Sequence, residues 1–354
     1  MQVLILPGDG IGPEIANAAR RGLEALDARF ALGLQLSEGR VGLAALERDG
    51  TTWPDAAEAA VRAADLTILG PVDTAAYPSP EEGGVNPSAA VRTRLELYAN
   101  MRPSRALKGV PALAPGMDLL VARENTEGFY ADRNMFAGSG EFMATEDVGL
   151  AVRKITRRGS ERIARVAFAA ARDRRRKVTV VHKSNVLKHT DGLFERVAYE
   201  VGAEWPDVEV DDVHVDAAAA LLVREPERFD VLLCTNMFGD ILSNLAAELS
   251  GGLGLGGSIN AGDAVAVAQA AHGSAPDIAG KDMANPSALL FSTAQLLAWK
   301  GTREQNNTLM EASRVLERTV ERLLALPETR TPDLGGPLGT RAFADRVVAG
   351  ISEG

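Results

Sequence analysis

Two oxygen-bearing side chains stand four residues apart in the segment Cys234 to Asn244, and their spacing suits metal binding. The apolar run Val231 to Cys234 predicts a buried strand, and a helical pattern begins at Ile241. Asp240 and Asn244 would then lie on one helix face and point at one position. Oxygen ligands of this kind suit a hard cation such as Mg²⁺ or Mn²⁺. The alternative is that Asp240 only caps the helix.

Three arginines, Arg92, Arg102 and Arg123, could bind an anionic substrate. Arginine stays charged, and its planar guanidinium grips a carboxylate at two points. A cluster of three therefore predicts a site for a di- or tricarboxylate. Their spacing alone favours the alternative that they are separate surface arginines.

A lysine and a glycine-rich turn follow apolar runs. Lys183 comes after the run Val178 to Val181, and a lysine beside a metal and arginines can have its pKa lowered enough to act as a base. An exposed lysine at a strand end is the alternative. Gly8, Gly10 and Gly12 favour a dinucleotide-binding turn, although their GxGxG spacing departs from GxGxxG.

The composition limits the classes of function. With 354 residues and 46% hydrophobic residues, the chain can fill two domain cores. A formal net charge of −10 argues against nucleic-acid and anionic-membrane partners. A single cysteine excludes an intramolecular disulfide and favours a reducing compartment. Because the sequence has no apolar run of membrane-spanning length and no signal peptide, we expect a cytoplasmic protein.

Short apolar runs alternate with alanine-rich helical patterns along the chain, which predicts an α/β protein. The helical patterns include Glu14 to Leu26 and Arg162 to Arg172. The expected strands are Val3 to Leu6, Leu66 to Leu69, Leu119 to Ala122, Val178 to Val181 and Val231 to Cys234.

Six motifs occur in a fixed order, and together they are far more specific than any one of them. In this order the set closely resembles the metal-dependent β-decarboxylating dehydrogenases, a family that includes isocitrate, homoisocitrate, 3-isopropylmalate, tartrate and D-malate dehydrogenases. The likeness runs from Val3 to about Gly301. The motifs are Leu6 to Glu14, Tyr98 to Pro103, Arg123 to Tyr130, His182 to Leu187, Cys234 to Asn244 and His272 to Lys281.

The resemblance implies an isocitrate/isopropylmalate dehydrogenase-like α/β fold with a discontinuous large domain. Residues 1–98 and 250–354 would form this domain, and residues 99–249 an inserted small domain. Residues 134–148 would be an arm that clasps a second subunit. A homodimer or higher homo-oligomer with shared active sites is therefore expected.

The resemblance also implies catalytic roles. Lys183 would enter the partner subunit's site and take the proton of the substrate's C2 hydroxyl, and Tyr130 would protonate the carbon left after decarboxylation. Asp216 would be a metal ligand given by the other subunit and would help to pass the proton from Lys183. Asp240 would be the local ligand. Asn244 stands where the family usually has a third aspartate, so the site loses one negative charge.

By the same resemblance the cofactor is NAD. An acid at Asp277 would accept hydrogen bonds from both ribose hydroxyls and repel the 2′-phosphate of NADP. Gln269 replaces a common glutamate, with no consequence evident from the sequence. The residues expected to bind the cofactor are Thr74, Asn185, His272, Gly273, Ser274, Ala275, Asp277 and Asn285.

The resemblance predicts an NAD-dependent and Mg²⁺- or Mn²⁺-dependent oxidative decarboxylase of a 3-substituted malate, a small hydroxy-di- or tricarboxylate. Arg92, Arg102 and Arg123 would bind its malate part, and Ser88 and Asn86 would contact the third substituent. Because these two side chains are polar, isocitrate or homoisocitrate is expected. Tartrate, D-malate and 3-isopropylmalate are the alternatives. A non-catalytic regulatory paralogue is a hypothesis of another class.

Overall fold

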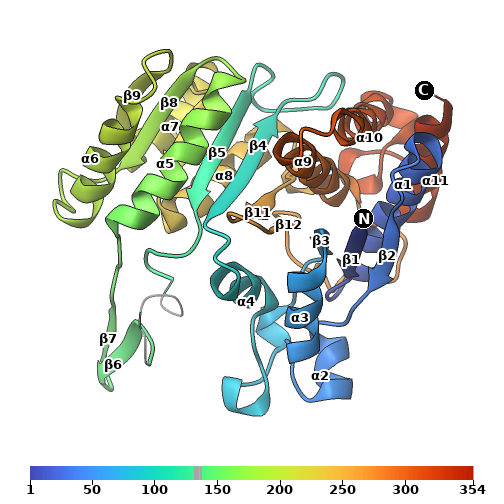
Figure 1. Ribbon diagram of the computed structural model, residues 1–354, viewed down its shortest axis with the longest axis horizontal. Helices are drawn as coiled ribbons and strands as arrows, with labels where there is room; N and C mark the ends of the chain where they lie inside the picture. The colour runs from blue at the N-terminus through green and yellow to red at the C-terminus, as the bar shows by residue number, and fades with distance from the viewer. Residues whose placement is uncertain (131–134, 136–137, 354) are drawn as a thin grey trace. The chain divides into compact units, whose positions relative to one another are not determined.

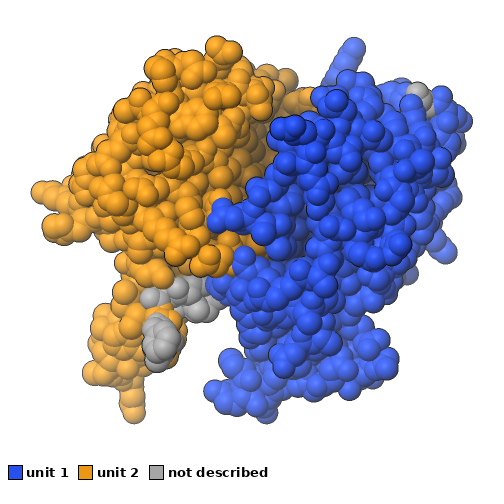
Figure 2. Space-filling model, in the orientation of Figure 1, with its two compact units in different colours: residues 1–95, 107–112, 251–354 blue, residues 96–106, 113–250 orange. Residues whose placement is uncertain are grey.

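The computed structural model describes residues 1–130, 135 and 138–353, and within it the chain forms two compact units (Figure 2). Unit 1 comprises Met1–Leu95, Leu107–Ala112 and Gly251–Gly354, and unit 2 comprises Glu96–Ala106 and Leu113–Ser250. The prediction assigned all of residues 99–249 to one inserted domain. The structure differs from this division in three places, because residues 96–98 and Ser250 belong to unit 2 and the short segment 107–112 belongs to unit 1.

Unit 1 is built on strands in the order β2-β1-β3-β12-β11 (Figure 1). Strand β1 (Gln2–Leu6) runs parallel to β2 (Gln35–Glu38) and β3 (Leu66–Leu69), and β12 (Ala266–Ala268) is parallel to β3 and antiparallel to β11 (Ile259–Ala261). The helices are α1 (Gly12–Phe30), α2 (Leu43–Asp49), α3 (Asp55–Ala63), α4 (Pro87–Arg94), α9 (Ser287–Arg303), α10 (Asn307–Ala325) and α11 (Thr340–Glu353).

Helix α1 shows how the sequence specifies this unit. Pro13 stands in its first turn, where a missing N–H costs nothing. Ile15, Ala19, Leu23 and Leu26 are buried at helical spacing and form the apolar face of the helix. The strands β1 and β3 are buried almost throughout, as parallel strands covered on both faces are.

Unit 2 has its strands in the order β4-β5-β10-β8-β9. Strand β4 (Ala99–Arg105) is antiparallel to β5 (Asp118–Glu124), whereas β5, β10 (Val231–Cys234), β8 (Lys177–His182) and β9 (Glu209–His214) are parallel neighbours. The parallel strands therefore end at the same edge of the sheet, where ligand sites of α/β sheets form. The helices are α5 (Arg157–Arg172), α6 (Thr190–Gly202), α7 (Val215–Arg224) and α8 (Asn236–Ser250).

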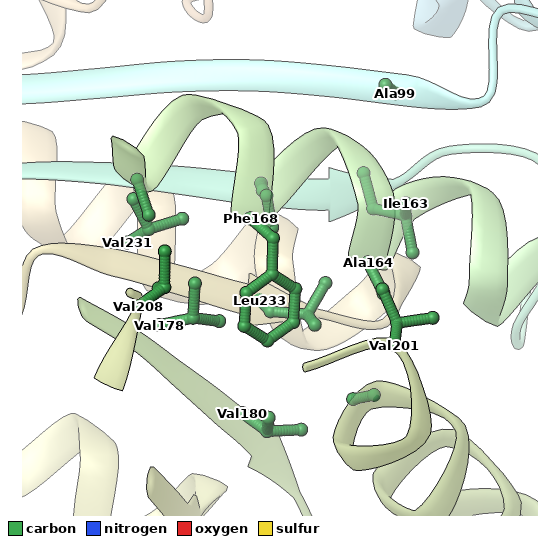
Figure 3. Packing of buried hydrophobic residues seen from close by; sticks show 14 of the residues in the cluster. Ala99, Ile163, Ala164, Phe168, Val178, Val180, Val201, Val208, Val231 and Leu233 are labelled. Carbon is green, nitrogen blue, oxygen red and sulfur yellow. The ribbon is translucent and has the colours of Figure 1, made fainter. Parts of the chain in front are cut away.

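Two apolar cores hold the unit 2 sheet. In one of them Phe168 points from α5 toward the strands that carry Val178 and Leu233 (Figure 3). In the other, Leu232 packs with Leu242 of α8 and Phe229. Neighbouring side chains of β10 thus enter different cores, which is why the whole strand is apolar.

The structure confirms the predicted alternation of strands and helices, with one correction at a helix start. The helix expected from Ile241 begins at Asn236, so Asp240 lies inside α8 and does not cap it. The single cysteine, Cys234, is fully buried in β10, and burial raises the pKa of its thiol. None of the described helices is both long and apolar enough to cross a membrane.

The predicted arm falls in an exposed hairpin of β6 (Glu141–Thr145) and β7 (Val148–Ala151). Residues 134, 136 and 137 of that arm lie outside the described residues. Phe142, Met143 and Leu150 are about half exposed or more on the hairpin.

Candidate active site

The carboxylate of Asp240 is the point at which four predicted site residues meet. Its Oδ1 accepts a hydrogen bond from Arg123 at 2.5 Å and lies 3.1 Å from a guanidinium nitrogen of Arg102. Its Oδ2 accepts the hydroxyl of Tyr130 at 2.7 Å. Two cations, a phenol and a carboxylate are thereby held together in unit 2.

Arg102 and Arg123 are buried, so for these two the surface alternative is wrong. Their side chains are 8% and 1% exposed. Arg123, near the end of β5, also donates to the Oδ1 of Asn236 at 2.7 Å, and Arg102 donates to the hydroxyl of Ser243 at 2.9 Å. Burial lowers the pKa of Arg102, and the nearby charge of Asp240 opposes that shift. These arginines are fixed cations of the kind that binds carboxylates.

The oxygens of Asp240 and Asn244 converge on one cationic position, as their spacing predicted. Arg102 donates to the Oδ1 of Asn244 at 3.4 Å from the same nitrogen that faces Asp240. A pair of oxygens that already shares a cation fits a divalent metal ion. Within the described residues, no group of three His, Cys, Asp or Glu side chains that could hold a metal ion includes Asp240.

Lys183 and Asp216 form a second group. Lys183 follows β8, and its Nζ donates to Asp216 in the first turn of α7 at 2.5 Å. This hydrogen bond holds the pKa of Asp216 below its usual range. The Asp216 side chain is 68% exposed, and Asn185 is exposed as well. In the described part of the chain, neither Lys183 nor Asp216 is hydrogen-bonded to Tyr130 or Asp240.

A buried ion pair that the sequence analysis missed connects the segments carrying these groups. Arg153 pairs with the fully buried Asp191, which also accepts the backbone N–H of Lys183 at 2.7 Å. Arg153 donates to Thr235, the residue before α8, at 3.1 Å. Its guanidinium lies over the rings of Phe129 and Phe238. Phe129 is next to Tyr130, and Phe238 is two residues before Asp240. Arg153 and Asp191 are 38 positions apart, so no local pattern indicates them.

In unit 1, helix α4 carries the third arginine and the predicted specificity residues. Asn86 caps the helix by accepting the backbone N–H of Ala89 at 3.1 Å. Ser88 stands in the first turn, one turn before the half-buried Arg92. The buried Gln269, which follows β12, contacts both side chains: it accepts from Arg92 at 3.3 Å and donates to Ser88 at 2.6 Å.

The glycine turn and the His272 to Gly280 loop lie against each other in unit 1. Ile11 donates its backbone N–H to Ser274 at 2.8 Å. A Cβ on Gly10 would lie 2.0 Å from the same carbonyl oxygen, so only glycine fits there. The buried Asp9 accepts the backbone N–H groups of Leu43 and Asp73 at 2.7 and 2.9 Å, which fixes the chain before Thr74. The sequence analysis gave Asp9 no role.

Several of the residues predicted to bind the cofactor have polar groups that a ligand could contact. Asp277, Gly273 and Thr74 are exposed, and a Cβ on Gly273 would meet only open space. Burial lowers the pKa of His272, and its buried Nε2 has no hydrogen-bond partner in the described part of the chain. Such an atom fits a ligand with a polar edge.

Asn285 and Ala275 complete this set. Asn285 is held by Asp333, to which it donates at 2.9 Å, and by the N–H of Ser287, which it accepts at 2.9 Å. Ala275 adopts the left-handed region that non-glycine residues seldom enter, with φ 40°. The backbone of the loop therefore turns at Ala275 and is not extended there.

A family model for isocitrate/isopropylmalate dehydrogenase matches residues 2–347. The chain belongs to this family. The 3-isopropylmalate dehydrogenase of Archaeoglobus fulgidus is 42% identical over 352 residues, which cover 98% of each chain. The isocitrate/homoisocitrate dehydrogenase of Thermus thermophilus is 41% identical over 351 residues, covering 99% of this chain and 98% of that one. The isocitrate dehydrogenase structure from Methylococcus capsulatus superposes with a TM-score of 0.87 at 39% identity, covering 99% of both chains.

Membership in the isocitrate/isopropylmalate dehydrogenase family confirms the predicted family, the predicted α/β fold and the expectation of an oxidoreductase. It does not confirm the expected preference for isocitrate or homoisocitrate. Relatives of nearly equal identity bear both kinds of name, and that of Archaeoglobus fulgidus favours the 3-isopropylmalate alternative.

Proposed function

We propose that this chain is an NAD-dependent and Mg²⁺- or Mn²⁺-dependent dehydrogenase that oxidatively decarboxylates a 3-substituted malate. The observation that carries the proposal is the convergence of Arg102, Arg123 and Tyr130 on Asp240. The buried guanidinium groups of Arg102 and Arg123 can bind substrate carboxylates. The phenol of Tyr130 beside them can donate a proton. The names of the relatives support the same reaction class.

The arginines bind the substrate and stabilise charge. Arg102 and Arg123 are held by Asn100, Asn236 and Ser243, so they need little reorganisation when a carboxylate arrives. We assign Arg92 of unit 1 to the same substrate by its residue type. The arginines also stabilise the enolate that remains after CO₂ leaves.

Lys183 and Tyr130 handle the two protons. Lys183 takes the proton of the C2 hydroxyl as the alcohol is oxidised, and Asp216, 2.5 Å from its Nζ, passes that proton on. Tyr130 protonates the enolate carbon, and its hydroxyl is already oriented by Asp240. When bound at Asp240 and Asn244 with Asp216 of a second copy, a divalent cation supplies the positive charge that makes the C2 hydroxyl more acidic. Bound NAD supplies the hydride acceptor.

For the cofactor we propose NAD rather than NADP. The exposed carboxylate of Asp277 accepts ribose hydroxyls and repels a 2′-phosphate. We expect at least a tenfold preference for NAD in kcat/KM, or about 1.4 kcal/mol. Steady-state rates with the two cofactors measure it, and equal use of NADP would contradict the assignment.

For the substrate we propose isocitrate or homoisocitrate, because Ser88 and Asn86 are polar. The name of the Archaeoglobus fulgidus relative favours 3-isopropylmalate instead. Tartrate and D-malate complete the panel. NADH formation followed by absorbance, with Mn²⁺ and each substrate in turn, tests the proposal.

The Tyr130→Phe variant is the control for this assay, because it removes the proton donor and keeps the ring. We expect it to lower decarboxylating turnover strongly. If the purified chain oxidises no member of the panel, the non-catalytic paralogue becomes the better description.

We also propose a homodimer or higher homo-oligomer. The half-exposed apolar side chains of the β6–β7 hairpin and the exposed carboxylate of Asp216 support it, because both would gain partners in a second copy. Size-exclusion chromatography with light scattering measures this.

A further inference from the structure

His182 is a buried histidine that directly precedes the proposed base, Lys183, and has no role in the proposed function. It is the last residue of β8, and its side chain is 1% exposed. Its Nδ1 accepts the backbone N–H of Ser184 at 3.1 Å, so this hydrogen bond closes a turn around Lys183. Its Nε2 lies 3.0 Å from a carboxylate oxygen of Asp212 on β9. The ring therefore connects the turn that carries Lys183 to the neighbouring strand.

The partners of the His182 ring determine which of its nitrogens carries the proton. A backbone N–H can only donate, so Nδ1 must accept and is unprotonated. In the neutral ring the proton is then on Nε2, which donates it to Asp212. The hydroxyl of Tyr199 also donates to Asp212, at 2.6 Å, and this hydrogen bond is the largest cause that holds the pKa of Asp212 below its usual range. The carboxylate of Asp212 is thus a fixed acceptor for the Nε2 proton.

His182, Glu195 and Asp212 also carry ligand atoms close enough to hold a metal ion. The contacts of the ring argue against that use. Nδ1 already accepts from Ser184 and Nε2 carries the proton, so the ring offers no lone pair to a cation. Glu195 is 3.6 Å from Nδ1, beyond hydrogen-bond distance. The cluster is therefore suited to hold the ring in one orientation.

The turn around Lys183 has its other backbone groups paired. The N–H of Lys183 donates to Asp191 at 2.7 Å, and its carbonyl accepts two further backbone N–H groups, at 3.0 and 2.8 Å. The hydrogen bond from Ser184 to His182 completes this set. A fixed backbone sets the direction in which the lysine side chain leaves, and its Nζ then meets Asp216 at 2.5 Å.

His182 also contacts the chain before Asp216. It is the register partner of His214 at the end of β9, and the two rings meet edge to face with their centroids 5.3 Å apart. His214 directly precedes α7, whose second residue is Asp216. His182 therefore touches the segments that carry both members of the Lys183–Asp216 pair.

We infer that His182 is a positioning residue for proton transfer: with its proton on Nε2, its Nδ1 holds the turn in the geometry that brings Lys183 to Asp216. This inference rests on the proposed role of Lys183 as the base. Because the His182 side chain is buried and engaged at both nitrogens, it acts through Lys183 and not on the substrate. Loss of the Nδ1 acceptor should therefore lower kcat and leave the substrate KM nearly unchanged, since small displacements of a base are costly in rate.

Two substitutions separate the two ring nitrogens. His182→Asn keeps an acceptor near the position of Nδ1, and asparagine commonly accepts the N–H two residues on. His182→Gln keeps a donor near the position of Nε2 and leaves the Ser184 N–H without its acceptor. We expect His182→Gln to lower kcat roughly tenfold or more at a nearly unchanged KM, and His182→Asn to stay within roughly threefold of the wild type. His189→Gln, at an exposed histidine that follows the same turn, is the matched control and should match the wild type.

The position of the proton can be measured without turnover. The ¹⁵N NMR spectrum of wild-type protein labelled at its four histidines resolves protonated from unprotonated ring nitrogens. The His182 signals are assigned by elimination, with variants of the other three histidines. At about pH 8 we expect a protonated Nε2 and an unprotonated Nδ1.

Equal losses of kcat in His182→Asn and His182→Gln would overturn the inference, as would a loss seen in KM alone or a proton on Nδ1. If neither variant folds, the NMR spectrum of the wild type decides. A wild type that oxidises no member of the substrate panel would instead contradict the proposed function, and with it the role of His182.

Discussion

At the scale of single residues, the central feature is that Asp240 is shared. Both of its oxygens already bind protein groups, Arg123 and Arg102 on one and Tyr130 on the other. Asn244 adds an oxygen without a charge, and Arg102 reaches that oxygen too. A divalent cation at this point must compete with a guanidinium for both ligands, so the charge at position 244 should matter for metal affinity.

Replacing Asn244 by aspartate should strengthen metal binding. The Asn244→Asp variant restores a carboxylate, and cation binding at such sites is largely electrostatic. We expect the Mn²⁺ concentration for half-maximal NADH formation to fall several-fold. The Asn244→Ala variant is the control and should raise that concentration. An unchanged Mn²⁺ requirement with a changed substrate KM would instead place Asn244 against the substrate.

The segment around Asp240 also shows which features of single residues can be predicted from the sequence. The four-residue spacing placed Asp240 and Asn244 on one face correctly. The helix start was wrong because Asn236 and Gly239, which are weak helix formers, lie inside α8. Tertiary contacts hold that first turn: Asn236 accepts from Arg123 and donates to the carbonyl of Glu127 at 2.9 Å.

At the scale of elements, the ends of neighbouring strands become a site only when something fixes them relative to each other. The Arg153–Asp191 pair does this for the chain after β8, the start of α8 and the segment before Tyr130. Local patterns predicted the strands β1, β3, β5, β8 and β10, because apolar runs are visible in a short window. They could not predict a buried pair whose members come from distant segments, nor β2, a mostly exposed strand with little apolar signal.

Breaking this pair should destabilise unit 2. The Asp191→Asn variant leaves the Arg153 cation buried without its counter-charge, which should lower the free energy of unfolding by about 3–5 kcal/mol. The exposed pair Arg157–Glu200 is the matched control, since both side chains are about half exposed. Glu200→Gln should cost less than about 1 kcal/mol. Denaturant titrations of both variants measure the difference, and equal losses would exclude a special role for Asp191.

A second element-scale contact fixes α4, which carries Ser88 and Arg92. Glu58 of α3 accepts from Arg62 at 2.8 Å and from Arg94, the last residue of α4, at 3.0 Å. The hydrogen bonds from Arg62 and then Arg94 lower the pKa of Glu58 to about 2. Because this pKa is below the value of 4.5 expected for an unpaired glutamate, the ionised carboxylate stabilises the folded chain.

The contribution of Glu58 should disappear in acid. It is fully present above the unpaired value of 4.5 and is lost as the pH falls toward the folded value of about 2. Since both arginines are about half exposed, we expect Glu58→Gln to cost only about 0.5–1 kcal/mol at pH 7. Thermal unfolding of both proteins between pH 7 and pH 2 should show the difference narrowing below pH of about 4.5. A difference that stays constant with pH would indicate that packing, and not charge, holds this contact.

At the scale of the whole molecule, the candidate catalytic residues of unit 2 fall into two groups. Tyr130 belongs with Asp240 and the arginines, whereas Lys183 belongs with Asp216. We propose that the exposed Asp216 joins Asp240 and Asn244 of a second copy, so that a complete site needs two chains. The sequence predicted which residue types are needed. It could not show this division, because each group is assembled by strand order rather than by spacing.

Shared sites make a specific prediction for mixtures of inactive variants. Lys183→Ala removes the base and Tyr130→Phe the proton donor, so each homodimer should be nearly inactive. If Lys183 acts in the partner's site, a hybrid dimer has one intact site and one site that lacks both groups. The intact site is that of the Lys183→Ala subunit, which contributes its own Tyr130 and receives the partner's Lys183. After subunit exchange, an equal mixture that forms half hybrids should regain about a quarter of the wild-type rate, since one site in two is intact in half of the dimers. Activity in the mixture is compared with that of each variant alone, and exchange is verified with differently tagged subunits. If verified hybrids stay inactive, Lys183 and Tyr130 must act within one chain.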